Sequence, residues 1–206
     1  MTTLRIPVWD LAVRLFHWSL VAFFTIAYLT GDENDTLHVY SGYIVLGLVL
    51  FRIFWGIVGT RHARFSDFVS TPRQVVAYLG GLVSRKPKHY LGHNPAAGWM
   101  IVALLASLLA TGYSGLKVYG AEGHGPLAAN TELVLVQSTA YADEGEVADR
   151  DGDKQAENFW EEVHEFFANL TLVLVFMHIA GVFVSSWLHR ENLVKAMITG
   201  RKTING

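Results

Sequence analysis

The chain contains no cysteine and few charged residues. The absence of cysteine excludes disulfide bonds, cysteine-ligated iron–sulfur clusters and the C-x-x-C-H attachment of a covalent haem. Only 17% of its 206 residues are charged, against roughly 25% in an average soluble domain. The net charge is −2 and no basic stripe with interleaved aromatic residues is present, so nucleic acid is not an expected partner.

Several local signatures are absent as well. The chain has no G-x-S-x-G, P-loop or G-x-G-x-x-G motif, and no serine–histidine–acid set is indicated by spacing. Its N-terminus is a poor signal peptide, because the first apolar run carries His17 and Trp18 and ends in Thr30-Gly31-Asp32 rather than at a cleavage site. We therefore expect this run to remain as an uncleaved membrane span.

The chain has long apolar segments instead. Its residues are 51% hydrophobic, and the mean hydropathy is +0.30. Four apolar segments each approach the roughly 20 residues that cross a bilayer. These are residues 8–29, 39–59, 96–116 and 163–188, with a long outer loop at 115–162. The pattern predicts an all-α integral membrane four-helix bundle that forms a single domain over residues 1–206. The first segment is the weakest, and Arg14 would have to reach the interface by snorkelling.

The distribution of basic residues predicts the orientation. Twelve of the sixteen lie in the N-terminal end, the link between the second and third segments, and the C-terminus. The outer loop has only Lys117, Arg150 and Lys154. By the positive-inside rule, both termini are cytoplasmic and the acidic loop faces outward from a bacterial inner membrane.

The two longest connections have features of their own. The cytoplasmic link at 60–95 contains an amphipathic run, residues 74–82, which we expect along the membrane surface. In the outer loop, residues 131–142 fit a strand or a short interfacial helix, and both remain open. Residues 143–162 are rich in charge and are expected to be a solvated stretch.

The histidines carry the clearest pattern. His164 and His178 lie fourteen residues apart, which on a helix places them within about 40° of one face and roughly 21 Å apart along the axis. His17 lies near the cytoplasmic start of the first segment, and His38 opens the second on the outer side. Depth therefore pairs His17 with His178 and His38 with His164. Two such pairs are what bis-histidine haem b needs, with the haems gripped between helices.

Arg52 adds independent support. It follows His38 by fourteen residues and so lies on the same helix face, roughly 21 Å deeper. A buried cation at the level of His17 and His178 would bind a haem propionate or a quinone head group. The alternative is an arginine that snorkels from the helix end.

Other readings of the histidines stay open. His38 and His164 also fit ordinary interfacial positions, whereas His178, in mid-span without a nearby acid, is costly to bury without a ligand or partner. The remaining histidines are expected at the surface, with His189 as the reserve ligand. They are His62, His89, His93, His124 and His189.

A set of motifs runs along nearly the whole chain. They are Arg14-Leu-Phe-His17-Trp18, His38 with Gly42, Arg52 before Trp55, Tyr90-Leu-Gly-His-Asn-Pro95, Phe159-Trp160-Glu-Glu-Val-His164, His178, His189-Arg-Glu-Asn-Leu193 and Gly200-Arg201-Lys202. As a set they resemble the bacterial cytochrome b561 family, which includes the cytochrome b subunits of nickel–iron hydrogenases.

The resemblance implies a four-helix membrane bundle with two haem b groups that passes electrons between a quinone pool and a partner protein. Carried over by position, the family's ligands fall on His17, His38, His164 and His178. It also implies a bound quinone near one haem, without indicating which one. We expect the acidic outer loop to dock a periplasmic cytochrome c or another redox subunit, such as a hydrogenase-like one.

Two alternatives from other classes remain. The first is a stand-alone quinone-linked superoxide oxidase, which resembles some small members of the family and would need a cationic pocket beside the outer haem. The second is a metal or proton transporter that uses the same histidines. A purely structural membrane anchor is the weakest reading, because it leaves His178 and Arg52 unexplained.

Overall fold

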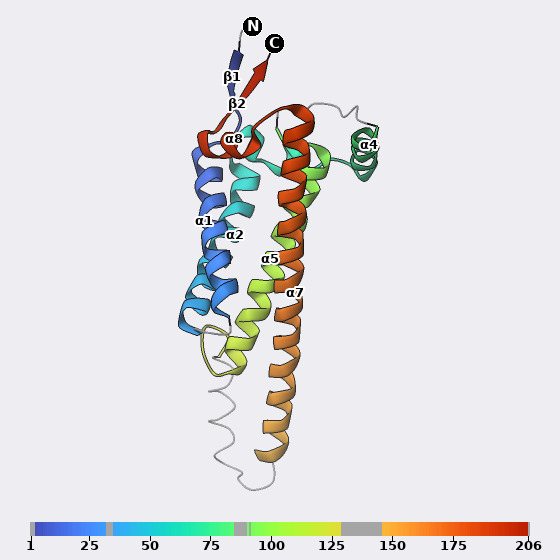
Figure 1. The fold of residues 1–206 in the computed structure, drawn as a ribbon. Helices are drawn as coiled ribbons and strands as arrows, with labels where there is room; N and C mark the ends of the chain where they lie inside the picture. Colours follow the sequence, from blue (N-terminus) through green and yellow to red (C-terminus); the bar gives the residue numbers. More distant parts are fainter. Residues whose placement is uncertain (1–2, 32–34, 85–89, 91, 129–145, 206) are drawn as a thin grey trace. The chain divides into compact units, whose positions relative to one another are not determined.

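The computed structural model describes residues 3–31, 35–84, 90, 92–128 and 146–205, and most of these are helical (Figure 1). In chain order the elements are β1 (Thr3–Pro7), α1 (Leu11–Thr30), α2 (Asp35–Val58), η1 (Arg61–Ala63), α3 (Phe65–Phe68), α4 (Pro72–Val83), α5 (Pro95–Ala121), α7 (Glu146–His189), α8 (Leu193–Thr199) and β2 (Arg201–Asn205).

Four of these helices are long and apolar enough to cross a membrane. They are α1, α2, α5 and the Glu157–His189 part of α7. Many of their large apolar side chains are exposed, among them Leu50 at 55% and Phe176 at 63%. Such surfaces are stable only where lipid covers them. The four predicted spans are confirmed, with ends shifted by a few residues.

Parts of the predicted outer loop at 115–162 are helical. The helix α5 continues to Ala121, and α7 already begins at Glu146, so most of the expected solvated stretch at 143–162 is helical. Glutamate, lysine, arginine, alanine and glutamine are good helix formers, and a helix that does not pack on a core needs no apolar stripe. Hydrophobic patterning therefore could not find it. The segment 131–142, where strand and helix were both open, lies outside the described residues.

The described chain divides into two compact units. The first comprises residues 1–106 and 172–206, and the second comprises residues 107–171. The helices α5 and α7 each have one part in the first unit and one part in the second.

In the first unit, Asp10 fastens the start of α1 to the end of α2, and the two helices lie side by side (Figure 1). Asp10 is the N-cap of α1, where its Oδ1 accepts a hydrogen bond from the Val13 amide at 2.7 Å. Its Oδ2 accepts from Trp55 Nε1 at 3.0 Å and from the Thr60 hydroxyl at 2.5 Å. Burial alone would raise the pKa of Asp10, but these hydrogen bonds and the charge of Arg52 lower it below 3.8.

The chain termini pair with each other. The strands β1 and β2 form an antiparallel sheet in which Thr3 faces Asn205 and Pro7 faces Arg201. Next to it, the Gly200 carbonyl accepts hydrogen bonds from the Val8 and Trp9 amides at 2.9 and 3.1 Å. The expected all-α class is therefore amended by a two-stranded sheet. The pairing of the two ends agrees with the even number of predicted spans.

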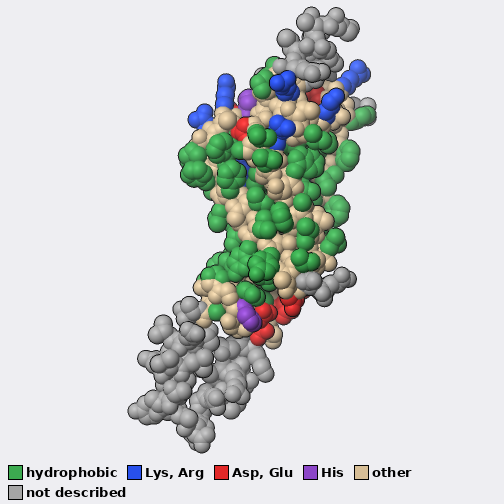
Figure 2. Space-filling view, turned by 90° about the vertical axis from the view of Figure 1, so that its left-hand side faces the viewer, with side chains coloured by type: hydrophobic (Ala, Val, Ile, Leu, Met, Phe, Trp, Pro, Cys, Tyr) green, Lys and Arg blue, Asp and Glu red, His purple; other side chains and the backbone are tan. Residues whose placement is uncertain are grey.

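Basic side chains gather at this same end, next to a belt of apolar side chains (Figure 2). In the link at 60–95, the amphipathic run at 74–82 forms most of the helix α4. Its position along the membrane surface stays a prediction. Thr71 caps the start of α4 and forms a capping box with Gln74. Pro72, between them, occupies the first helical position. Tyr78, 5% exposed, anchors α4 through its ring contact with Tyr90 at 5.8 Å between centroids.

The second unit is held by small polar side chains between α5 and α7. The hydroxyls of Ser107 and Thr171 lie 2.7 Å apart, and both side chains are almost fully buried. Ser114, 1% exposed, donates to the carbonyl oxygens of Ala110 and Thr111. Small residues of this kind let helix backbones approach closely where lipid offers no hydrophobic driving force.

Candidate functional site

The first unit brings His17 and His178 face to face. Their ring centroids lie 6.5 Å apart, with the ring planes inclined by 50°. Both side chains are half-buried, and the buried Nδ1 of His17 has no hydrogen-bond partner. The helices α1 and α7 therefore bring together the two residues that depth alone paired.

This separation fits a metal ion held between the two rings. Imidazole nitrogens coordinate metals at about 2 Å, which would place the centroids of two trans ligands about 6 Å apart. The spacing makes this pair a candidate bis-histidine site.

Arg52 is a buried cation that no carboxylate of the described residues contacts through a hydrogen bond. Its side chain is only 3% exposed, and its guanidinium carbon lies 5.3 Å from the ring centroid of Phe65 and 5.8 Å from that of Phe68. Its Nη1 is buried and has no hydrogen-bond partner. A guanidinium in this state suits an anionic group such as a carboxylate.

His93 was expected at the surface, and that expectation is wrong. Its ring lies between Trp9 and Phe68, at centroid distances of 4.4 and 4.7 Å, and its Nδ1 is buried without a partner. Burial lowers the pKa of His93 to about 3, and nearby positive charges add to this effect. These charges belong to Arg52, Lys202, His178 and His62. Its place in the basic link at 60–95 had led us to expect a surface residue.

The other histidines that were expected at the surface differ in their exposure. His62 is half-buried and lies 3.0 Å from the carboxylate of Asp67. His124 is exposed and stacks on Tyr119 at 5.2 Å, as expected of a surface residue. His189 is half-buried, and His89 lies outside the described residues.

His38 lies in the first turn of α2 and is half-buried. Its Nδ1 lies 2.9 Å from the carbonyl oxygen of Ala27. A carbonyl only accepts, so Nδ1 carries the proton and Nε2 holds the lone pair of the neutral ring. Hydrogen bonds of this kind commonly orient metal-ligating histidines.

His164 shows the same arrangement in the second unit. Its Nδ1 lies 2.9 Å from the Thr111 carbonyl oxygen and 3.2 Å from the Ser114 hydroxyl. Its ring also packs directly against Gly115, a residue that sequence analysis did not single out. Since His38 and His164 belong to different units, their pairing remains a prediction.

Among the residues that the structure describes, no three histidine, aspartate or glutamate side chains come together to hold a metal ion. The candidate histidines therefore remain predicted as ligands of two-ligand sites.

Comparison with known proteins identifies the family. The family model described as prokaryotic cytochrome b561 matches residues 8–200. The chain belongs to this family. The cytochrome is similar to a probable Ni/Fe-hydrogenase B-type cytochrome subunit of Cupriavidus necator, at 25% identity over 95% of the chain and 86% of the relative. Similarly named relatives of Azotobacter vinelandii and Bradyrhizobium diazoefficiens are 24% and 23% identical, over 94% and 95% of the chain and 86% and 85% of their own lengths. No solved structure gives a significant match.

Family membership and the four apolar helices together make the chain a multi-pass membrane cytochrome that transfers electrons. The group that such a b-type cytochrome carries is haem b. The residues around His17, His178 and Arg52 fit this group, because two facing imidazoles and an unsatisfied buried cation match its iron and its propionates.

Proposed function

We propose that the chain is a dihaem b-type cytochrome that carries electrons across the bacterial inner membrane, with both termini cytoplasmic. It would act as one membrane domain over residues 1–206, between the quinone pool and a partner redox protein. The observation that carries the proposal is the 6.5 Å distance between the ring centroids of His17 and His178. The match to the cytochrome b561 family supports it.

In this proposal His17 and His178 hold the cytoplasmic haem iron through their ring nitrogens. A bound haem supplies the one-electron redox chemistry. Arg52 binds a propionate, which would satisfy the guanidinium nitrogen that has no partner within the described residues. Phe65 and Phe68 cover the guanidinium and keep water from it.

His38 and His164 hold the outer haem iron. The support comes from their depth in the spans and from the hydrogen bonds at Nδ1, which direct each Nε2 lone pair away from the helix that fixes the ring. These contacts also hold the rings against rotation and so keep the ligand geometry the same in both oxidation states.

The proposed quinone rests on the resemblance to the family, and the proposed partner protein rests on the relatives. The similar proteins are named as probable Ni/Fe-hydrogenase cytochrome subunits, which supports a hydrogenase-like subunit or a periplasmic cytochrome c as the partner. The acidic segment that includes residues 143–153 would dock a basic partner on the outer side. Unchanged electron transfer to the partner after deletion of this segment would exclude the docking role.

The test of the haem assignment is the dithionite-reduced minus oxidised spectrum of the detergent-purified protein, with haem quantified per chain. We expect a b-type α-band and two haems. His178→Ala and His164→Ala should each lose one haem, whereas His124→Ala, a substitution at an exposed histidine, should lose none.

The possible results separate the models. One haem in the unsubstituted protein would show that one of the two pairs is wrong. A folded protein without haem would overturn the proposal and favour the transport alternative, above all if zinc is retained.

A second candidate function is a quinone-linked superoxide oxidase. Lys117 supplies a cation near the outer end of α5, with its Nζ 5.9 Å from the ring centroid of Tyr113 and 5.7 Å from that of Trp160. It follows Gly115, which packs against His164, by two residues. Rapid superoxide consumption by the isolated protein that Lys117→Gln abolishes would favour this function.

A further inference from the structure

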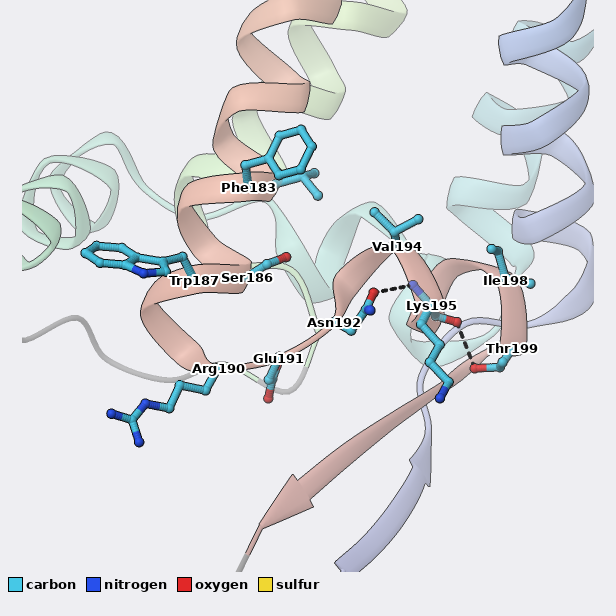
Figure 3. Close-up of a pocket in the computed structure, with 11 residues that line it drawn as sticks. Phe183, Ser186, Trp187, Arg190, Glu191, Asn192, Val194, Lys195, Ile198 and Thr199 are labelled. Atoms are coloured by element: carbon cyan, nitrogen blue, oxygen red, sulfur yellow. Dashed lines mark hydrogen bonds between the residues drawn. The ribbon is translucent and has the colours of Figure 1, made fainter.

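An open groove lies where α7 ends and the short helix α8 begins, entirely within the first unit (Figure 3). Its volume is about 920 Å³. Its lining includes Phe183, Trp187, Arg190, Glu191, Val194 and Lys195. None of these residues takes part in the histidine sites, and the proposed electron transfer leaves the groove without a role.

The groove carries a net positive charge. Arg190 and Lys195 are exposed cations on its lining. The acid among the lining residues, Glu191, is only 11% exposed and lies 3.2 Å from Lys202 Nζ, so its charge is already neutralised. Two uncompensated cations therefore remain at the mouth.

The same groove has an apolar wall. Phe183 and Trp187 on α7 are 67% and 73% exposed, and Val194 and Ile198 on α8 are 45% and 54% exposed. The two α8 residues are four apart and share one helix face. Since the span ends at His189, this wall lies where acyl chains meet head groups, a level at which tryptophan is enriched.

The backbone at Arg190 is unusual in a way that points to function. Arg190 has φ +52°, and it is the sole non-glycine residue with positive φ in the part of the chain that the structure describes. It follows α7 in a turn where the Glu191 amide donates to the Ser186 carbonyl at 3.1 Å, a position that glycine usually occupies. Strain of this kind usually persists where a side chain is needed. Figure 3 shows Arg190 projecting from the same side of α7 as Trp187.

We propose that this groove binds an anionic phospholipid of the cytoplasmic leaflet. Arg190 and Lys195 lie on opposite sides of the turn between α7 and α8 (Figure 3), and together they attract the negatively charged phosphate of the head group. The acyl chains lie along Phe183, Trp187 and Val194. Charge-assisted hydrogen bonds to phosphate and apolar contacts are then made by one molecule, which neither a soluble anion nor a neutral lipid provides.

The experiment measures lipid binding to the full-length, haem-loaded protein by native mass spectrometry. The probes are phosphatidylglycerol and phosphatidylcholine with the same acyl chains, and inorganic phosphate as the free anion. We expect phosphatidylglycerol to be retained preferentially. Each basic residue near a membrane surface contributes about fivefold to binding, so Arg190→Gln with Lys195→Gln should weaken it roughly 30-fold. The matched control is Arg64→Gln with Arg73→Gln, which removes two exposed cations that do not line the groove.

The single variant Arg190→Gly separates lipid binding from folding. Glycine relieves the positive-φ strain, so the thermal stability of this variant in plain detergent should stay equal or rise, while its added stability with phosphatidylglycerol should fall. The haem spectrum reports the fold independently, so a failure of the haem proposal is distinguishable from a failure here.

Three outcomes would overturn the proposal. The first is equal binding of the two lipids. The second is equal loss in the control pair, which would indicate a diffuse surface effect. The third is protection by inorganic phosphate as strong as that by the lipid, which would identify a free-anion site. Unchanged lipid binding in Arg190→Gly and in the double variant, with a partner protein lost instead, would assign the groove to a protein contact.

Discussion

A Cβ atom at Gly115 would lie 2.9 Å from Cε1 of His164, closer than real side chains approach. The imidazole therefore rests on bare backbone of α5, while the Thr111 carbonyl one turn earlier fixes its Nδ1. Gly115 is needed for the position of the ring, and Thr111 for its orientation.

Gly115→Ala should cost the cytochrome its outer haem. The added methyl group pushes the His164 ring away from α5, and the ring cannot then keep both its hydrogen bond and its ligand position. We expect the haem content to fall from two to one per chain in pyridine haemochrome assays. Gly80→Ala is the control, because a Cβ there meets nothing within 4 Å and the exposed helix α4 should gain stability. Two retained haems would show that Gly115 is a packing residue only.

Arg52→Gln should lower the midpoint potential of one haem. A cation near a haem disfavours its oxidised form, which carries one more positive charge, so its removal makes the haem easier to oxidise. At an effective dielectric constant near 20 and a separation of several ångströms, the shift is on the order of 50–100 mV. Redox titration of the α-band measures it. Arg52→Lys keeps the charge and should recover most of the potential, whereas an equal shift in both haems would contradict the placement of Arg52 beside the cytoplasmic haem.

The sequence predicted the spans and the closeness of His17 to His178 for a physical reason. Membrane helices must be long and apolar, so their length is visible in composition, and helical periodicity relates depth to residue number. His17 and His178 followed from these two rules alone, and the structure brings their rings together.

What the sequence could not show depends on contacts between distant segments. The β1–β2 pair joins residues about 200 positions apart and has no local signal. The burial of His93 arises from Trp9 and Phe68, which lie in separate parts of the chain. Gly115 was overlooked because its role depends on a histidine of another helix. The start of α7 was overlooked because its charge-rich sequence has no apolar stripe.

Gly200→Ala should destabilise the junction of the termini. Gly200 has φ +78°, and a Cβ there would lie 2.7 Å from the Trp9 carbonyl oxygen. The left-handed conformation alone costs a non-glycine residue about 1–2 kcal/mol, and the clash adds to this cost. Gly123→Ala is the matched control, with φ +80° and no atom within 4 Å. Thermal unfolding should show a larger loss of stability for the Gly200 variant than for the Gly123 variant. Equal losses would mean that the backbone at Trp9 moves aside without a measurable cost.

Asp10 should make the stability of the cytochrome depend on pH in the acid range. Its folded pKa lies below the ordinary value of 3.8, so the folded state binds fewer protons than the unfolded state at low pH. The stabilisation is therefore fully present above pH 3.8 and is lost as the pH falls through the folded pKa. Asp10→Asn keeps an N-cap acceptor without a titrating group, so its stability should change less with pH over this window. Asp10→Ala should lose about 1 kcal/mol even at pH 7, because the cap is gone. Thermal unfolding in detergent from pH 3 to 7 measures all three proteins. If the asparagine variant lost stability with acid as steeply as the native chain, another carboxylate would have to be responsible.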